Sequence, residues 1–146
     1  MSFALDLKAF AEKTSAKANA VVRKVVIDVG TSLVMKSPVG DPTYWKGSAP
    51  PGYVGGRFRA NWQYGLGSID KTTTEKVDAS GQATISAIVG TVKPDAAGEI
   101  HYITNSLPYA MALEDGHSWR QAPNGMVNLT VLEFQPIVEA AAKEVQ

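Results

Sequence analysis

Apolar residues recur every three or four positions through the first quarter of the chain. Between Phe3 and about Met35 they form one series: Phe3, Leu7, Phe10, Ala18, Val21, Val25, Val29 and Leu33. This spacing places them on one face of an α-helix, and lysine and arginine side chains occupy the opposite face. Lys24 and Asp28 are spaced for an i,i+4 ion pair. Ser37-Pro38 ends the predicted helix, because proline disfavours the α conformation in the residue before it.

The pattern then changes to alternation. In Phe58–Leu66 every second residue is apolar, which predicts a β-strand with one buried and one polar face. Ala83–Val92 alternates in the same way and predicts a second strand. The polar stretch Ser68–Gln82 is interpreted as the hairpin connection between these two strands. Glu99–Asn105 predicts a third, shorter strand.

Helical spacing returns near the C-terminus. Pro108–Gly116 predicts a short helix that Gly116 stops. From Met126 onward the apolar residues again follow a helical period, and Pro136 must kink that helix or mark a break before it. A strand over Val127–Glu133 followed by a helix from Pro136 is the alternative. The element order predicts one α+β domain over residues 1–146, with a long N-terminal helix and a C-terminal helix packed on a small, mainly antiparallel sheet.

Residues 40–55 form a long loop rich in proline, glycine and aromatic side chains. Such loops are uncommon unless they are functional or disordered, and the aromatic content opposes disorder. Its aromatic residues, with two residues of a later loop, could be a satellite cluster, anchors of a protein interface, or a stacking platform for sugars or bases. We favour the interface, because Trp, Tyr and Arg dominate binding hot spots. The residues concerned are Tyr44, Trp45, Tyr53, Trp119 and Arg120.

Two arginines, Arg57 and Arg59, lie on the polar face of the first predicted strand. They are either a solvated face or a pair of bidentate clamps for carboxylates of an adjoining subunit. We include both among the predicted interface residues.

Composition narrows the possible functions. The chain has 14 basic and 14 acidic residues, so no general attraction to nucleic acid or to an anionic membrane is expected. It has no cysteine, which excludes a disulfide scaffold and thiolate-bound zinc and suits a protein made in a reducing cytoplasm. No signal-peptide pattern and no apolar run long enough to span a membrane are present.

Candidate catalytic groups are few. The histidines are His101 and His117, and a metal site can be drawn from Glu114, Asp115 and His117. No metal-binding, nucleophile or phosphate-binding motif surrounds them. We therefore expect no catalytic residue, no metal and no cofactor. A small metal-dependent hydrolase at these three residues remains the enzymatic alternative, and a ligand-binding module that uses the tryptophan-bearing loops is another.

Three ordered blocks resemble one family. Ser37-Pro38-Val39, followed after a gap by residues 56–62, resembles the Ser-Pro-Val-Asp-Thr-Gly-Arg-Leu-Arg-x-Ser/Asn-Trp signature of small bacteriophage neck and tail-completion proteins. Residues 104–110 and 113–118 are similar to that family's Asn-x-x-Pro-Tyr-Ala-x-x-Leu-Glu-x-Gly-x-Ser block. Residues 121–127 are similar to its closing segment. In the family pattern the strand that carries the two arginines follows Ser-Pro-Val almost directly. In this chain residues 40–55 lie between them, and we interpret these residues as an insertion.

The resemblance implies an α+β virion subunit, made in the host cytoplasm, that forms a ring between the capsid portal and the tail as a neck, tail-completion or tail-terminator protein. It implies no enzymatic activity. The implied partners are further copies of the chain, with sixfold or twelvefold symmetry, the portal or adaptor proteins, and the tail tube. Viral DNA would pass through the ring without specific binding. Subunits of a ring need two complementary faces that join head to tail.

Overall fold

The computed structural model describes residues 3–95 and 97–145, and the side chains of residues 15–43, 45–95 and 97–145. The predicted apolar positions Phe3, Leu7 and Phe10, and the side chain of Tyr44, lie outside these described side chains. The helices are α1 (Phe3–Lys36), α2 (Gln82–Thr91), α3 (Ala110–Glu114), α4 (Val127–Leu132) and α5 (Phe134–Val145); the strands are β1 (Trp62–Leu66) and β2 (His101–Asn105); η1 (Pro42–Tyr44) and η2 (Arg59–Asn61) are single 3-10 turns. The predicted α+β class is confirmed.

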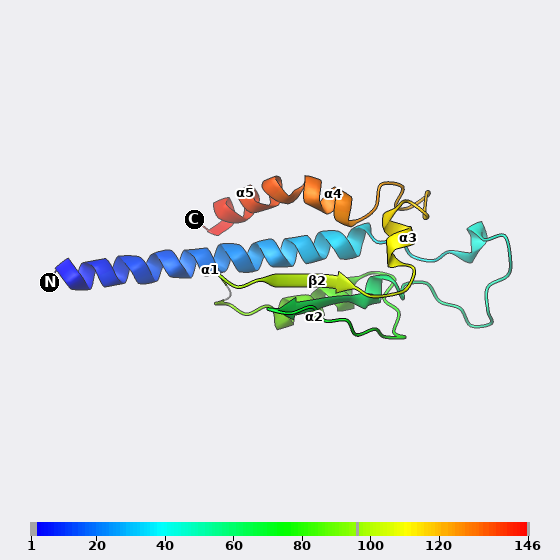
Figure 1. The fold of residues 1–146 in the computed structure, drawn as a ribbon, viewed down its shortest axis with the longest axis horizontal. Coiled ribbons are helices and arrows are strands. Elements are labelled where there is room, and N and C mark those ends of the chain that lie inside the picture. The colour runs from blue at the N-terminus through cyan, green and yellow to red at the C-terminus, as the bar shows by residue number, and fades with distance from the viewer. Residues whose placement is uncertain (1–2, 96, 146) are drawn as a thin grey trace.

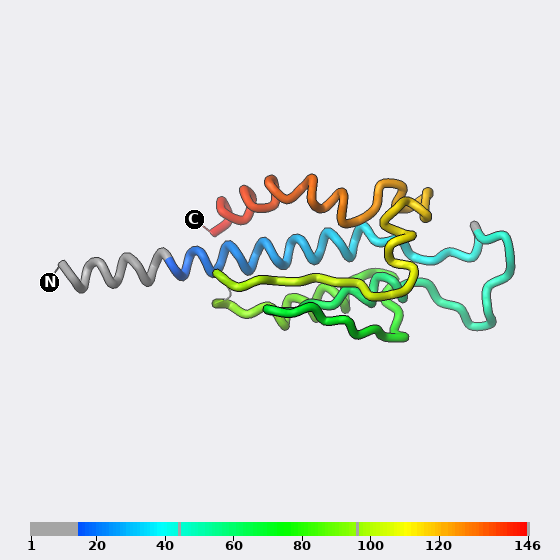
Figure 2. Tube along the Cα trace, viewed as in Figure 1, coloured from blue at the N-terminus to red at the C-terminus, as the bar shows by residue number. Residues whose placement is uncertain are grey.

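Helix α1 is the central element of the fold. α4 and α5 lie along one side of it, and the sheet with α2 lies along the other (Figures 1 and 2). The long N-terminal helix was predicted correctly, including its end before Ser37-Pro38. Lys24 Nζ and Asp28 Oδ1 are 3.1 Å apart, which confirms the predicted ion pair.

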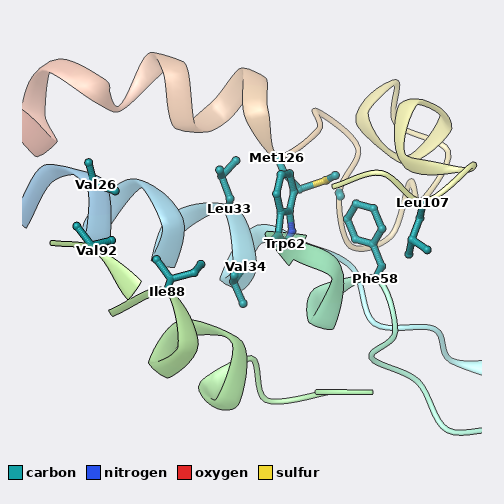
Figure 3. Close-up of a cluster of buried hydrophobic side chains, with 10 residues drawn as sticks. Val26, Leu33, Val34, Phe58, Trp62, Ile88, Val92, Leu107 and Met126 are labelled. Carbon is teal, nitrogen blue, oxygen red and sulfur yellow. The ribbon is translucent and has the colours of Figure 1, made fainter. Parts of the chain in front are cut away.

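The core lies where α1 meets the sheet, α2 and the start of α4 (Figure 3). Val34 of α1 and Met126 before α4 are completely or almost completely buried. Phe58 and Trp62 pack edge to face, with ring centroids 5.8 Å apart. The buried apolar side chains are Val26, Leu33, Val34, Phe58, Trp62, Ile88, Val92, Leu107, Ala122, Met126 and Ala141. Trp62 thus belongs to the buried face that the alternation predicted.

The sheet has two antiparallel strands in the described residues, with Trp62 opposite Asn105 and Leu66 opposite His101. The third predicted strand is confirmed as β2. The first predicted strand is confirmed only from Trp62 onward. Arg59–Asn61 is a 3-10 turn instead, closed by the hydrogen bond from Asn61 N to Phe58 O, which is 3.1 Å long.

The prediction of a strand over Ala83–Val92 was wrong, because this segment is helix α2. The side chains that it buries, Thr84, Ile88 and Val92, are spaced by four residues, as a helix requires. Ser68–Gln82 is therefore not a hairpin connection: β1 pairs with β2, and α2 lies between them in the chain.

Two residues of α1 position α2. Gly30 has no Cβ, and an added one would lie 3.3 Å from Ile88, so the two helices approach closely there. Arg23 donates to the carbonyl of Val89 at 3.1 Å and to that of Val92 at 3.4 Å. A cation at these carbonyls also opposes the partial negative charge at the helix end.

The C-terminal segment is helical, as its apolar spacing predicted, and the alternative of a strand over Val127–Glu133 is wrong. The sequence predicted either a kink at Pro136 or a break before it. The structure has the break, at Glu133 between α4 and α5. The predicted stop of α3 at Gly116 is also confirmed. Gly116 has φ 88°, and the N–H groups of Gly116 and His117 donate to Leu113 O and Ala112 O.

Residues 45–58 contain no helix or strand, and the loop around them projects from the body at the end opposite the N-terminus (Figure 1). Within the described residues, no helix combines the length and apolar character needed to cross a membrane.

Candidate functional site

A groove of about 750 Å³ lies where the projecting loop meets α3 and the loop after it. Six of the predicted interface residues have described side chains, and those that line the groove are Trp45, Tyr53, Arg57, Trp119 and Arg120. These residues come from segments up to 75 positions apart in the sequence. The sequence suggested each of them as an interface residue, and the fold places them around one groove. Arg59 lies outside this lining.

The first wall of the groove is an aromatic pair. The rings of Trp45 and Tyr53 meet edge to face, with centroids 4.8 Å apart. Gly40 makes this possible, because a Cβ there would collide with the Tyr53 hydroxyl. Asp41 begins η1 by accepting from Thr43 N at 3.0 Å, and hydrogen bonds from Thr43 lower the pKa of Asp41. Trp45 and Tyr53 remain 42% and 39% exposed, so packing within the loop does not fully bury them.

The second wall is the segment after α3. The Arg120 guanidinium lies over the Trp119 ring, 4.3 Å from its centroid, and Trp119 is 67% exposed. Gln121 ties this segment to the start of the loop: its Oε1 accepts from Val39 N at 2.8 Å, and its Nε2 donates to Val39 O at 2.7 Å. These two bonds join the second wall to the start of the projecting loop.

The floor is formed by Phe58 and Tyr109, whose ring centroids are 6.1 Å apart. Partial burial raises the pKa of the Tyr109 phenol, and the nearby Arg57 charge opposes that rise. The phenol is therefore a neutral hydrogen-bonding group at neutral pH. The charged lining residues are Asp41, Lys46, Arg57 and Arg120, so the groove combines aromatic surface with more basic than acidic groups.

The placement of Arg57 and Arg59 on a strand face was wrong, because both precede β1 and Arg59 belongs to the 3-10 turn η2. Both have partners within the chain. Arg57 donates to Glu75 Oε1 at 3.0 Å and to Thr74 O at 3.2 Å. Arg59 donates to three carbonyls, of Met35, Ser37 and Ala79, at 3.0, 2.9 and 2.6 Å. Arg59 thereby fastens the end of α1 to the loop before α2. Its role between subunits stays a prediction.

Sequence reasoning missed a buried polar junction beside the groove. Ser37 Oγ donates to Leu33 O at 2.6 Å and accepts from Trp62 Nε1 at 2.7 Å. Asn61 is completely buried. It donates to Arg57 O at 2.7 Å and to Thr74 O at 3.0 Å, and accepts from Thr74 N at 2.8 Å. The signal was in the sequence, because both residues belong to the first block of the family resemblance.

The other blocks have comparable roles. Asn105 donates to Phe58 O at 2.9 Å. The Glu114 carboxylate accepts from the N–H groups of Met126, Val127 and Asn128 at 3.0, 2.9 and 2.9 Å, and so begins α4. Gly125 fits against Glu114 because it lacks a Cβ. The three blocks meet in one hydrogen-bonded region of the fold.

The histidines are in different surroundings. Tyr64 Oη and His101 Nδ1 are 2.7 Å apart, and burial followed by the Glu99 charge raises the pKa of Tyr64. His117 lines the groove. Glu114 belongs to the hypothetical metal site of Glu114, Asp115 and His117. Both of its carboxylate oxygens accept hydrogen bonds from backbone N–H groups. Among the described residues, no group of three or more histidine, aspartate or glutamate side chains could hold a metal ion.

No family model, curated protein or solved structure matches this chain.

Proposed function

We propose that this protein is a structural subunit of a bacteriophage virion that assembles into a ring at the head–tail junction. The observation that carries the proposal is the meeting of the three resemblance blocks in one junction. They span residues 37–127, yet hydrogen bonds connect them in the fold. Asn105 of the second block donates to Phe58 O of the first, and Glu114 of the second block accepts from Met126 N of the third. Within the first block, Ser37 Oγ accepts from Trp62 Nε1. A shared folding junction gives a physical reason for an ordered pattern of otherwise weak motifs.

The surface supports an assembly role. The aromatic groove and the projecting loop leave large side chains in water, with Trp119 and Val54 each at least 60% exposed. Contiguous exposed aromatic surface is typical of protein contacts. The chain carries no net charge, which suits a ring through which DNA passes without being held.

The proposed test deletes Thr43–Val54. Gly55 packs directly against the Gly40 carbonyl, so the ends of the deleted segment are already adjacent and the fold can close across them. We expect the deletion variant to keep the helical circular dichroism of the wild type. We also expect it to lose assembly in light scattering and electron microscopy, where the wild type forms rings of six or twelve subunits. Thr72→Ala, on another exposed loop, is the matched control.

The decisive localisation experiment uses particles made from the replicon that encodes this chain. A tagged copy of the protein should give density at the boundary between portal and tail. Intact particles without the protein would overturn the proposal, as would a deletion variant that is folded and assembles normally.

The groove also favours a second candidate function, a ligand-binding module. Trp45, Tyr53 and Trp119 line one concave surface of about 750 Å³, a volume in the range of small-molecule sites. A monomer whose tryptophan fluorescence changes with a glycan or peptide, and is unaffected by protein concentration, would favour this function over the ring.

A further inference from the structure

A second groove, of about 510 Å³, runs along α1 between β2 and α5. Its lining is almost entirely apolar and includes Val21, Val25 and Val29 of α1, Ile103 of β2, and Phe134 and Val138 of α5. The α1 positions that line it extend from Val21 to Leu33, which is about 18 Å at 1.5 Å per residue. Phe134 is 49% exposed. The chain therefore leaves a valine-lined groove unfilled along α1.

The same chain carries a helical segment that extends beyond its own body. α1 begins at Phe3 and passes the ends of α5 and β2 (Figure 1). Residues 15–18 are all exposed. The first side chain of α1 with a described bond to the body is Asn19, which accepts from Ala97 N at 3.1 Å. The part of α1 before Asn19 includes Phe3, Leu7 and Phe10, apolar side chains whose removal from water lowers the free energy.

We propose that residues 3–14 of one copy occupy the valine-lined groove of a second copy. Phe3, Leu7 and Phe10 have the i, i+4, i+7 spacing that places three side chains on one helical face. That spacing is the pattern by which a helix anchors itself in a groove. Twelve residues of helix are about 18 Å long, which equals the length of the groove.

Only another copy can supply this segment. α1 is one continuous helix from Phe3 to Lys36, so its first turns cannot fold back onto Val21–Leu33 of the same chain. The donated helix and the receiving groove are different surfaces of the chain, and repetition of such a contact produces a ring or a filament. The inference rests on the proposed ring and identifies the contact that would build it.

The test uses engineered cysteines, because the chain contains none of its own. Leu7 lies near the middle of the donated segment. It falls opposite Val25 if the donated helix runs parallel to α1 and opposite Val29 if it runs antiparallel, so Leu7→Cys/Val29→Cys is made and treated in the same way as the variant below. The double variant Leu7→Cys/Val25→Cys, treated with oxidised glutathione, should form a ladder of disulfide-linked dimers, trimers and larger species. Lys8→Cys/Val25→Cys is the matched control, because Lys8 lies on another face of the helix.

We expect about tenfold or more cross-linking in one of the two Leu7 variants over the control, since docked thiols have a far higher effective concentration than thiols of freely diffusing chains. An equimolar mixture of the two single-cysteine variants should stop at dimers. Circular dichroism of each variant verifies that the fold is kept.

The outcomes separate the two proposals. Rings in light scattering with cross-linking no greater than in the control would overturn the helix docking and leave the proposed ring. Monomers with no cross-linking would overturn both. Cross-linked dimers and nothing larger from the double variant would mean that two copies exchange helices reciprocally, and would overturn the head-to-tail contact.

Discussion

Asn61 provides the sharpest test of the buried junction. Its side chain is completely buried and makes three hydrogen bonds that connect the turn before β1 to the loop before α2. In Asn61→Ala, Arg57 O and Thr74 N lose their described partners, whereas Thr74 O keeps the bond from Arg57 Nε at 3.2 Å. A buried backbone group left unsatisfied costs about 1–3 kcal/mol. Arg57 and Thr74 are half-buried, so we take the cost of each group from the lower half of that range.

We therefore expect Asn61→Ala to lower the free energy of unfolding by about 3 kcal/mol. With an unfolding entropy of about 2.1 cal/mol/K per residue, a chain of 146 residues has about 0.3 kcal/mol/K in total. The melting temperature should then fall by about 10 °C. Thermal and urea unfolding followed by circular dichroism measure both quantities.

Thr72→Ala is the matched control, because Thr72 is exposed and its hydroxyl donates to Asp70, two positions away on the same loop. A surface change of this kind should shift stability by no more than about 0.5 kcal/mol. If Asn61→Ala costs less than about 1 kcal/mol, the junction does not hold the two segments together, and the structural account of the first resemblance block fails.

Two further substitutions test other parts of the fold. Glu114→Ala removes the acceptor for three N–H groups at the start of α4 and should cost about 1–2 kcal/mol in urea unfolding, with Glu114→Gln between it and the wild type; equal stability of all three would contradict the capping role. Burial opposes the Asp78 charge, but hydrogen bonds from Thr84, Gly81 and Ser80 outweigh it and lower the pKa of Asp78. Its contribution to stability is therefore present above the ordinary carboxyl pKa and lost as pH falls through the lowered value. Asp78→Asn should lose less stability than the wild type between pH 6 and pH 3, and parallel pH profiles would refute this.

Periodicity predicted the helices whose buried stripe is regular. α1 and the C-terminal helices follow it because each packs one face on the rest of the fold. It failed for α2, where Ile85, Ala87 and Val89 alternate by chance while Thr84 and Ile88 are the buried positions. β-branched residues favour strands by local preference, and tertiary packing against Gly30 overrides that preference here.

Polar roles were harder to predict than apolar ones. The alternation of Phe58–Leu66 places Asn61 on the polar face of the predicted strand, yet Asn61 is buried because the 3-10 turn directs it to Thr74. Trp45 and Trp119, by contrast, were predicted to be interface residues from their residue type alone. The fold places both of them around one groove. A residue type can indicate that a side chain belongs in a contact, but only the folded chain determines which distant carbonyl an asparagine reaches.

Several residues of the three blocks that resemble the phage family form hydrogen bonds within the fold, and this restricts where partners could bind. Ser37, Asn61 and Glu114 have their polar groups committed to the chain itself, so these positions specify how the subunit folds. In the proposed ring, neighbouring copies would therefore be recognised by surfaces outside the blocks or exposed at their edges. Two such surfaces project at opposite ends of the molecule: the first turns of α1 and the loop over residues 40–55 (Figure 1). A subunit with different contact elements at its two ends can join head to tail, and this arrangement, more than any single residue, connects the fold to the proposed ring.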